Sequence, residues 1–360
     1  MQEKTKNTII TIGFAIILFG IFFANLIAKD KTISTSERRK LAQFPEISIS
    51  PILNGDVFKK LEKYVEDQFI QRDTFRAIKS FWSTKIFAQK DNNKLFEKNN
   101  AIYKMEYPLN ENNMKKSAQK IKEVYEKYLK GMNVYYSIIP EKNYYLENDD
   151  HLKLDYNKIQ EIMKNELEGI KYIDILNGLE LDDYYRTDLH WKQENLQDVV
   201  KIIQYGMELD DIGVNYNVEN KGEFYGAYYG QLATDVAPDN LYILTNETLD
   251  ACTTYNAEKQ KNSPVYVETN SSDRYDIFLS GATSIISIEN PNAQTNKELI
   301  LFRDSFGSSI APLLVENYSK ITLVDLRYIS SKLLEQFIEF EDQDVLFLYS
   351  TVVLNQNILK

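Results

Sequence analysis

The sequence predicts an α/β protein with a parallel β-sheet and one N-terminal membrane helix. Short apolar runs rich in β-branched and aromatic residues alternate with longer segments of helical periodicity. The alternation is clearest after residue 298, where three such runs are separated by two helical segments. Strands separated by helices imply a parallel sheet with crossover helices. The membrane helix is predicted from an uncharged, mostly apolar stretch at residues 7–28.

The helical segments are recognised by apolar side chains that recur at steps of three and four residues. They lie at residues 57–90, 112–130, 154–169, 193–207, 308–318 and 331–340. The predicted strands lie at residues 133–140, 171–176, 299–302, 321–326 and 345–349. Residues 208–296 are rich in Asn, Thr, Tyr, Asp and Gly, so we expect an irregular, β-containing insertion there.

The stretch at residues 7–28 is long enough to cross the roughly 30 Å hydrocarbon core of a bilayer as a helix. It is long for the apolar core of a cleaved signal, and no clear small-x-small site precedes Lys29. An uncleaved signal anchor is therefore favoured over a cleaved signal peptide. We expect a juxtamembrane linker at residues 29–50 and a single domain at residues 51–360.

The charges that flank the anchor give conflicting indications of its orientation. Lys4 and Lys6 favour a cytoplasmic N-terminus at residues 1–6. Five basic residues between Lys29 and Lys40 favour the opposite orientation by simple counting.

Composition excludes several classes of function. The net charge of −11 disfavours a nucleic-acid partner, because binding phosphates requires a basic face. Cys252 is the only cysteine, so neither an intramolecular disulfide nor a cysteine-based metal cage is possible. Two histidines and one cysteine are a poor ligand set for zinc, although carboxylates could still bind a hard cation. We predict no metal and no cofactor.

The scarcity of histidine singles out His190. The chain has only His151 and His190, so a base that works near neutral pH has few other candidates. Asp188, two residues before His190, could fix the tautomer of the imidazole and stabilise its protonated form. A histidine that only packs beside Trp191 is the structural alternative. His151 lies in a polar segment and is the second choice for a base.

Ser305 is the candidate nucleophile. It directly follows the predicted strand at 299–302, and Gly307 and Ser308 then begin a helix. Ligands of open α/β sheets bind beyond the carboxyl ends of the strands, where a helix N-terminus also offers free N–H groups. Asp304 and Ser305 could instead merely cap that helix, because both residue types are favoured caps.

These residues resemble those of the DHHW and alginate acetylation (AlgX/AlgJ-like) proteins of the SGNH hydrolase superfamily. The resemblance rests on Thr187-Asp-Leu-His-Trp191, Asp304-Ser305 and Val324-Asp-Leu-Arg-Tyr328. Ser36-Glu-Arg-Arg-Lys-Leu-Ala-Gln-Phe-Pro45 also resembles the segment that follows the membrane anchor in these proteins. The similarity covers nearly the whole chain after the anchor, in the same order.

The resemblance implies a flavodoxin-like α/β/α sandwich outside the cytoplasm, with Ser305 as nucleophile, His190 as general base and Asp188 as its orienting residue. Leu189 replaces the first histidine of the DHHW name, which suggests that this position is not catalytic. Arg303 precedes Asp-Ser where SGNH enzymes usually have glycine.

Further site residues are expected from the same resemblance and from their positions. Gly281 is a candidate oxyanion donor. Arg327, Tyr328 and Trp191 are candidate substrate contacts, although Arg327 and Tyr328 could equally pack or pair structurally.

The implied function is transfer of O-acetyl groups to, or their removal from, a cell-surface or exported polysaccharide. Because acetyl-CoA is cytoplasmic, the resemblance also implies a membrane-bound O-acyltransferase partner that supplies acetyl groups. A non-catalytic carbohydrate-binding or scaffold protein of an export complex is the first alternative. A lipase-like hydrolase acting at the membrane face is the second.

Overall fold

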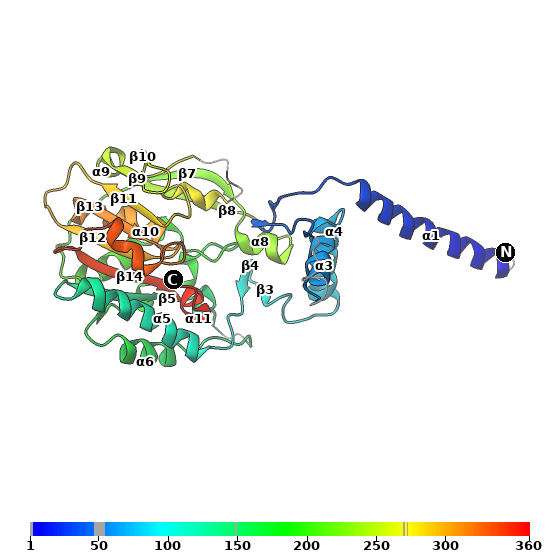
Figure 1. Ribbon diagram of the computed structural model, residues 1–360, viewed down its shortest axis with the longest axis horizontal. Helices are drawn as coiled ribbons and strands as arrows, with labels where there is room; N and C mark the ends of the chain where they lie inside the picture. Colours follow the sequence, from blue (N-terminus) through cyan, green and yellow to red (C-terminus); the bar gives the residue numbers. More distant parts are fainter. Residues whose placement is uncertain (1–2, 47–54, 148–149, 269–270, 272) are drawn as a thin grey trace. The chain divides into compact units, whose positions relative to one another are not determined.

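The computed structural model describes residues 3–46, 55–147, 150–268, 271 and 273–360 (Figure 1). The chain forms two compact units. The first contains Met1–Asn92 and Tyr229–Asp235, and the second contains Asn93–Tyr228 and Val236–Lys360. The sequence had suggested a single domain from residue 51, whereas the helices before residue 92 belong to the first unit. Residues 47–50 of the predicted linker lie outside the described residues.

The first unit is mostly helical. Its elements are α1 (Glu3–Ile27), β1 (Ile33–Ser34), β2 (Arg39–Lys40), α3 (Asp56–Gln68), α4 (Arg72–Phe81) and the π-helical turn η1 (Trp82–Ile86). Among the described residues, α1 is the one helix whose length and composition suit a membrane span. The prediction of one helical segment at 57–90 is wrong. The helix is interrupted between α3 and α4, where Gln71 has left-handed backbone angles (φ 53°).

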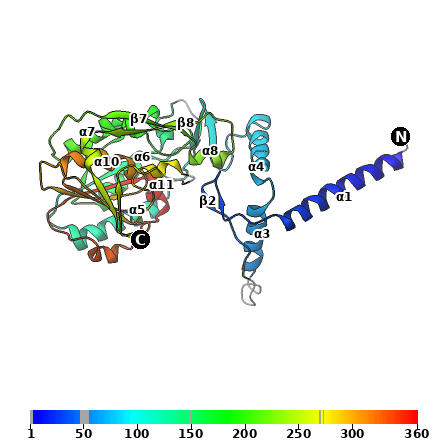
Figure 2. The ribbon, with the colours of Figure 1, turned by 90° about the horizontal axis from the view of Figure 1, so that it is seen from above.

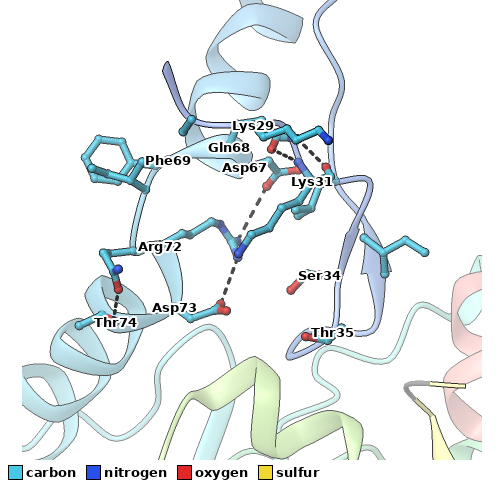
Figure 3. Close-up of a pocket in the computed structure, with 15 residues that line it drawn as sticks. Lys29, Lys31, Ser34, Thr35, Asp67, Gln68, Phe69, Arg72, Asp73 and Thr74 are labelled. Atoms are coloured by element: carbon cyan, nitrogen blue, oxygen red, sulfur yellow. Dashed lines mark hydrogen bonds and ion pairs between the residues drawn. The ribbon is translucent and has the colours of Figure 1, made fainter. Parts of the chain in front are cut away.

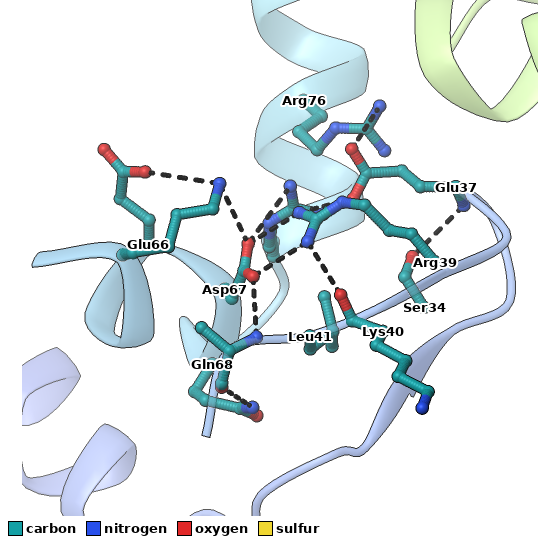
Figure 4. Close-up of polar contacts among 12 residues, drawn as sticks. Ser34, Glu37, Arg39, Lys40, Leu41, Glu66, Asp67, Gln68 and Arg76 are labelled. Carbon is teal, nitrogen blue, oxygen red and sulfur yellow. Dashed lines mark hydrogen bonds and ion pairs between the residues drawn. The ribbon is translucent and has the colours of Figure 1, made fainter. Parts of the chain in front are cut away.

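A network of charged side chains ties the linker to α3 and α4 (Figure 4). The buried carboxylate of Asp67 accepts hydrogen bonds from Arg39 at 2.6 and 2.8 Å, and these hold its pKa far below the usual range. Burial would raise the pKa of Glu37. The hydrogen bond from Arg72 and the charges of Arg76, Arg72 and Arg39 instead keep that pKa below its usual value. The inner side of the helix pair is therefore ionic.

A polar cavity of about 330 Å³ lies between the linker and the turn that joins α3 to α4 (Figure 3). Asp67, Arg72 and Asp73 are among its lining residues. In this unit, polar groups thus occupy positions that a globular domain fills with an apolar core.

The second unit is built around an eight-stranded sheet with the order β10-β9-β11-β13-β12-β14-β5-β6 (Figures 1 and 2). The strands of this sheet are β5 (Val134–Ile139), β6 (Lys171–Tyr172), β9 (Thr253–Asn256), β10 (Lys261–Pro264), β11 (Ile285–Glu289), β12 (Glu298–Arg303), β13 (Lys320–Val324) and β14 (Asp344–Ser350). Neighbouring strands from β13 to β6 pair in parallel, as the sequence predicted.

Helices cover both faces of this sheet (Figure 1). The longer helices are α5 (Glu111–Val124), α6 (Tyr156–Glu166), α7 (Gln197–Gly206), α10 (Gly307–Leu314) and α11 (Thr351–Gln356). Alternate residues of β5 enter two separate apolar cores: Tyr135 packs with residues of α7 and α10, and Tyr136 packs with residues of α5, α6 and α11. The fold is therefore a three-layer α/β/α sandwich.

The remaining elements lie outside the parallel part of the sheet. They are the hairpin β3 (Leu95–Lys98) and β4 (Ala101–Lys104), the hairpin β7 (Asn217–Phe224) and β8 (Asp239–Thr245), and the helices α8 (Ala227–Leu232) and α9 (Glu247–Ala251).

Two sequence-based expectations need correction. The insertion at 208–296 is not merely an excursion, because it adds β9, β10 and β11 to the central sheet as antiparallel strands. β9 and β10 are short and polar, which hides their membership of the sheet, whereas the apolar β11 lies between β9 and β13 and is almost fully buried. The helix predicted at 331–340 is a 3₁₀ segment over Ser331–Gln336.

Candidate active site

Ser305 lies at the carboxyl end of β12, in the turn that leads into α10. Because β12 is flanked by the parallel strands β13 and β14, this turn opens at the edge where such folds bind ligands. The carboxylate of Asp304 accepts hydrogen bonds from the N–H of Phe306 at 3.1 Å and of Ser350 at 2.8 Å. Asp304 thus fixes the turn, and the Ser305 hydroxyl is not needed as a helix cap.

The structure brings Ser305, His190 and Asp188 together. The Nε2 atom of His190 lies 2.8 Å from the Ser305 Oγ, and the Nδ1 atom lies 2.6 Å from Asp188 Oδ1. Asp188 is fully buried and His190 is 6% exposed, so water barely competes for these hydrogen bonds. The arrangement places a base against a hydroxyl and an orienting carboxylate behind the base.

The second carboxylate oxygen of Asp188 is also held. Oδ2 accepts a hydrogen bond from the N–H of Ala227 at 2.5 Å, while the N–H of His190 donates to Oδ1 at 3.0 Å. Gly226 packs directly against this loop: a Cβ atom there would lie 2.3 Å from both the Asp188 Cβ and the Thr187 carbonyl oxygen. Glycine is required for this close approach.

Lys142 forms hydrogen bonds with the backbone of the same loop. Its buried Nζ donates hydrogen bonds to the carbonyls of Tyr185, Arg186 and Asp188 at 2.8–3.1 Å. Burial lowers the pKa of Lys142 to about 7, although the charges of Asp188 and neighbouring carboxylates act in the opposite direction. The lysine satisfies three loop carbonyls that lie in a mostly buried position.

Asp239 fixes the start of the same loop. Its carboxylate accepts hydrogen bonds from the N–H groups of Arg186 and Thr187 and from the Thr187 hydroxyl, at 2.6–2.9 Å.

Aromatic rings enclose the imidazole. Tyr275 stacks on His190 with 3.9 Å between the ring centroids, and Phe306 lies 4.8 Å away. Burial raises the pKa of Tyr275 well above its usual value, so its hydroxyl stays protonated and donates to Ser309 Oγ at 2.8 Å. These contacts restrict the imidazole to the plane in which it meets Ser305.

Trp191 does not fit its predicted role as a substrate contact. It is fully buried, and its indole N–H donates to the Phe306 carbonyl at 3.1 Å and to Ser309 Oγ at 2.9 Å. Trp191 instead ties the histidine loop to the start of α10, next to Ser305.

The other predicted residues lie in structural contacts. The guanidinium of Arg327 binds both carboxylate oxygens of Asp325 at 2.9 and 2.7 Å, and Tyr328 is half-exposed. The N–H of Gly281 donates to the Phe278 carbonyl at 3.2 Å, so it is engaged within a turn. His151 stacks on Phe96, with 3.5 Å between the ring centroids.

Two side chains next to Ser305 and His190 in sequence have structural roles. The guanidinium of Arg303, which stands where SGNH enzymes have glycine, is buried and paired with Asp325 at 3.5 Å. Leu189 packs against the core.

Lys142, Gly226, Asp239 and Tyr275 are the site residues that sequence reasoning missed. They come from four separate segments, and nothing in a single sequence links such segments to one loop. A lysine directly after a strand was visible at position 142, but surface lysines are far more common.

The site contains no obvious place for a metal ion. Within the described part of the chain, no group of three or more His, Cys, Asp or Glu side chains could hold one. The arrangement suits acyl transfer through a serine nucleophile.

Comparison with known proteins agrees with this fold. The model of the DHHW protein family matches residues 148–324, a range that includes Asp188, His190 and Ser305. This match confirms the resemblance to the DHHW family in the part of the chain that carries the site. No curated protein sequence matches the chain at a significant level.

Several solved structures have a similar fold. A DHHW family protein from Eubacterium siraeum is 21% identical, with a TM-score of 0.62, over 74% of this chain and 95% of that one. PatB1 of Bacillus cereus is 18% identical, with a TM-score of 0.59, over 75% of this chain and 98% of that one. A second structure of PatB1, 17% identical with a TM-score of 0.59, carries a sulfonyl adduct and covers 74% of this chain and 96% of that one. These similarities confirm the three-layer α/β/α fold.

We predict that Gly226→Ala separates Asp188 from His190, because the added methyl group has no room against Asp188. The hydrogen-bonded Nδ1 proton of His190 gives a downfield proton NMR resonance in the wild type, and this resonance is lost in the variant. The control is His151→Gln, which keeps it. A resonance unchanged in Gly226→Ala contradicts the close approach.

We also predict a pH dependence of stability from Lys142. Its pKa is lowered in the folded state, so the unfolded chain binds more protons between about pH 7 and pH 10. The contribution of Lys142 to the free energy of unfolding therefore rises with pH across this window. Urea unfolding, followed by the fluorescence of buried Trp191, measures this rise.

The variant Lys142→Met removes this rise in stability. The exposed Lys201→Met serves as the control and keeps it. Equal pH profiles for wild type and Lys142→Met contradict the assignment.

Proposed function

We propose that this protein is a serine-dependent O-acetyltransferase or acetylesterase that acts on a cell-surface or exported polysaccharide. The observation that carries the proposal is the pair of hydrogen bonds that join Ser305 to His190 and His190 to Asp188, at 2.8 and 2.6 Å. The family resemblance adds the choice of an acetyl group and of a polysaccharide acceptor.

The reaction proceeds in two steps. Ser305 Oγ attacks the acetyl carbonyl of the donor while His190 Nε2 takes the hydroxyl proton, and the Asp188 carboxylate stabilises the imidazolium. The tetrahedral intermediate collapses, the donor alcohol leaves with the proton from His190, and acetyl-Ser305 remains. A sugar hydroxyl then gives its proton to His190 and attacks the acetyl group, which restores the serine. Water in place of the sugar makes the same site an esterase.

The oxyanion of each tetrahedral intermediate needs hydrogen-bond donors. The N–H of Ser305, at the entrance to α10, donates to no described residue, and we assign it to this role. The N–H of Phe306 is occupied by Asp304. Gly281 is not proposed as a second oxyanion donor, because its N–H already donates to the Phe278 carbonyl.

We propose that α1 anchors the chain in the cell membrane and that the second unit works outside the cytoplasm. The helix has 25 residues and is long and apolar enough for a bilayer span. A membrane-bound O-acyltransferase would then pass acetyl groups outward to Ser305.

A non-catalytic role in binding polysaccharide is the second candidate. The mostly buried position of His190, stacked on Tyr275, is compatible with a site that has lost turnover. The complete hydrogen-bond relay to a partly exposed serine favours the enzyme.

We predict that a sulfonyl fluoride labels Ser305 and that acetyl ester hydrolysis falls about a thousandfold or more in Ser305→Ala and His190→Ala. The reason is that each variant removes one partner of the proton transfer. Labelling is mapped by peptide mass spectrometry and turnover by release of acetate.

The matched control is Ser308→Ala, one turn further along α10, which keeps both activities. Absence of labelling in the wild type, or equal turnover in Ser305→Ala, favours the non-catalytic candidate.

A further inference from the structure

Helices α3 and α4 of the first unit and the turn η1 expose large apolar side chains and bury polar ones. In α4, in η1 and at the residue that follows η1, the large apolar side chains Phe75, Ile78, Phe81, Trp82, Ile86 and Phe87 are 47–67% exposed. We call these six residues the outer face. In contrast, Ser80 and Ser83 of the same segment are buried. A helix that packs on a globular core shows the opposite arrangement.

The inner side of α4 explains this inversion. Arg72 and Arg76 both bind Glu37. Figure 4 shows Arg76 directed toward Glu37. Arg76 also donates to the carbonyls of Gly230 and Gln231 at 2.8 Å. The helix is thus held by charged contacts on one side, and its apolar side chains cannot turn inward without breaking them. The outer face is a fixed feature of the unit.

Helix α3 repeats the pattern. Asp67 is buried, whereas Phe58 and Val65 are 63% and 54% exposed. Large apolar side chains exposed in this number on one unit mark a surface that contacts a partner or a membrane.

The contacts of α1 indicate that a membrane, and not a protein partner, covers this apolar surface. An apolar cavity of about 560 Å³ is lined by Leu18, Phe22 and Leu26 of α1 together with Val65 and Phe69 around the end of α3. The N–H of Ile70 also donates to the side chain of Asn25 at 2.9 Å. The apolar surface at the end of α3 therefore adjoins the proposed membrane span, and Phe69 there contacts Phe75 of the outer face, with 5.6 Å between the ring centroids.

The composition of the outer face also suits a bilayer interface. It consists of phenylalanines, isoleucines and a tryptophan, and the same helical segment carries lysines at positions 79 and 85. Interfacial helices carry aromatic and aliphatic residues on one face and basic residues beside them.

We propose that α4 and η1 lie in the membrane interface, with the outer face inserted among the lipid acyl chains. The anchored chain would then contact the bilayer through a second element besides α1. This inference rests on the proposed membrane anchor and goes beyond the proposed enzyme activity.

Tryptophan fluorescence tests this proposal in the full-length protein. The chain has two tryptophans, of which Trp191 is fully buried and Trp82 is half-exposed on the outer face. The protein is reconstituted into phosphatidylcholine vesicles with or without brominated acyl chains. The Trp82 signal is the difference between wild type and Trp82→Phe.

We expect brominated lipid to reduce the Trp82 signal at least about twofold, because bromine quenches only on contact. The residual fluorescence of Trp191 in Trp82→Phe stays unchanged. Acrylamide, an aqueous quencher, should reach Trp82 poorly in vesicles.

Other outcomes overturn the proposal. Trp82 that is quenched by acrylamide and not by brominated lipid faces water. Trp82 that is protected from both quenchers is covered by protein, such as a second copy of this chain. Flotation with the vesicles separately reports the anchor: protein that fails to float contradicts the anchor and this proposal together, while protein that floats without lipid quenching contradicts this proposal alone.

Discussion

The fixed position of the Asp188 carboxylate is the constraint on which the candidate site depends. One oxygen accepts hydrogen bonds from the His190 ring and backbone, and the other accepts from the N–H of Ala227. A carboxylate bound on both oxygens cannot rotate, so the imidazole that it holds has one available orientation. That orientation points Nε2 at Ser305, which the parallel strands around β12 place at the opposite edge of the site. The geometry is set before any substrate binds, which is what preorganised catalysis requires.

The residues around the site hold the loop that carries Asp188 and His190 in place. Lys142 holds three of its carbonyls, Asp239 holds two of its N–H groups, and Gly226 allows the close approach. Tyr275 and Trp191 close the other side. Buried polar groups are costly unless they are paired, so these contacts together stabilise the loop in one conformation.

The sequence was sufficient for the parts that depend on local pattern. Helical periodicity and β-rich apolar runs located the parallel half of the sheet, and the rarity of histidine pointed to His190. The sequence could not reveal that residues 253–289 complete the sheet, because β9 and β10 are short and polar and the antiparallel pairing joins segments that no local pattern links. It placed Trp191 at the substrate, although its burial makes it a structural residue. Lys142 and Gly226 act through contacts between distant segments, and no local pattern encodes such contacts.

Both units show how a few ionic contacts decide which surfaces remain available. In the first unit, the contacts of Glu37 and Asp67 turn the polar sides of α3 and α4 inward and leave apolar side chains outside. In the second, the contacts of Asp188 direct the imidazole of His190 toward the Ser305 hydroxyl.

The central claim is that Ser305 carries the acetyl group between donor and acceptor. The most direct test is peptide mass spectrometry of protein that has been mixed with an activated acetyl ester and quenched in acid within a single turnover. The account predicts the added mass of one acetyl group on the peptide that contains Ser305, and its absence in His190→Ala. An acetyl group found on another residue, or on Ser305 to the same extent in His190→Ala, would contradict the account.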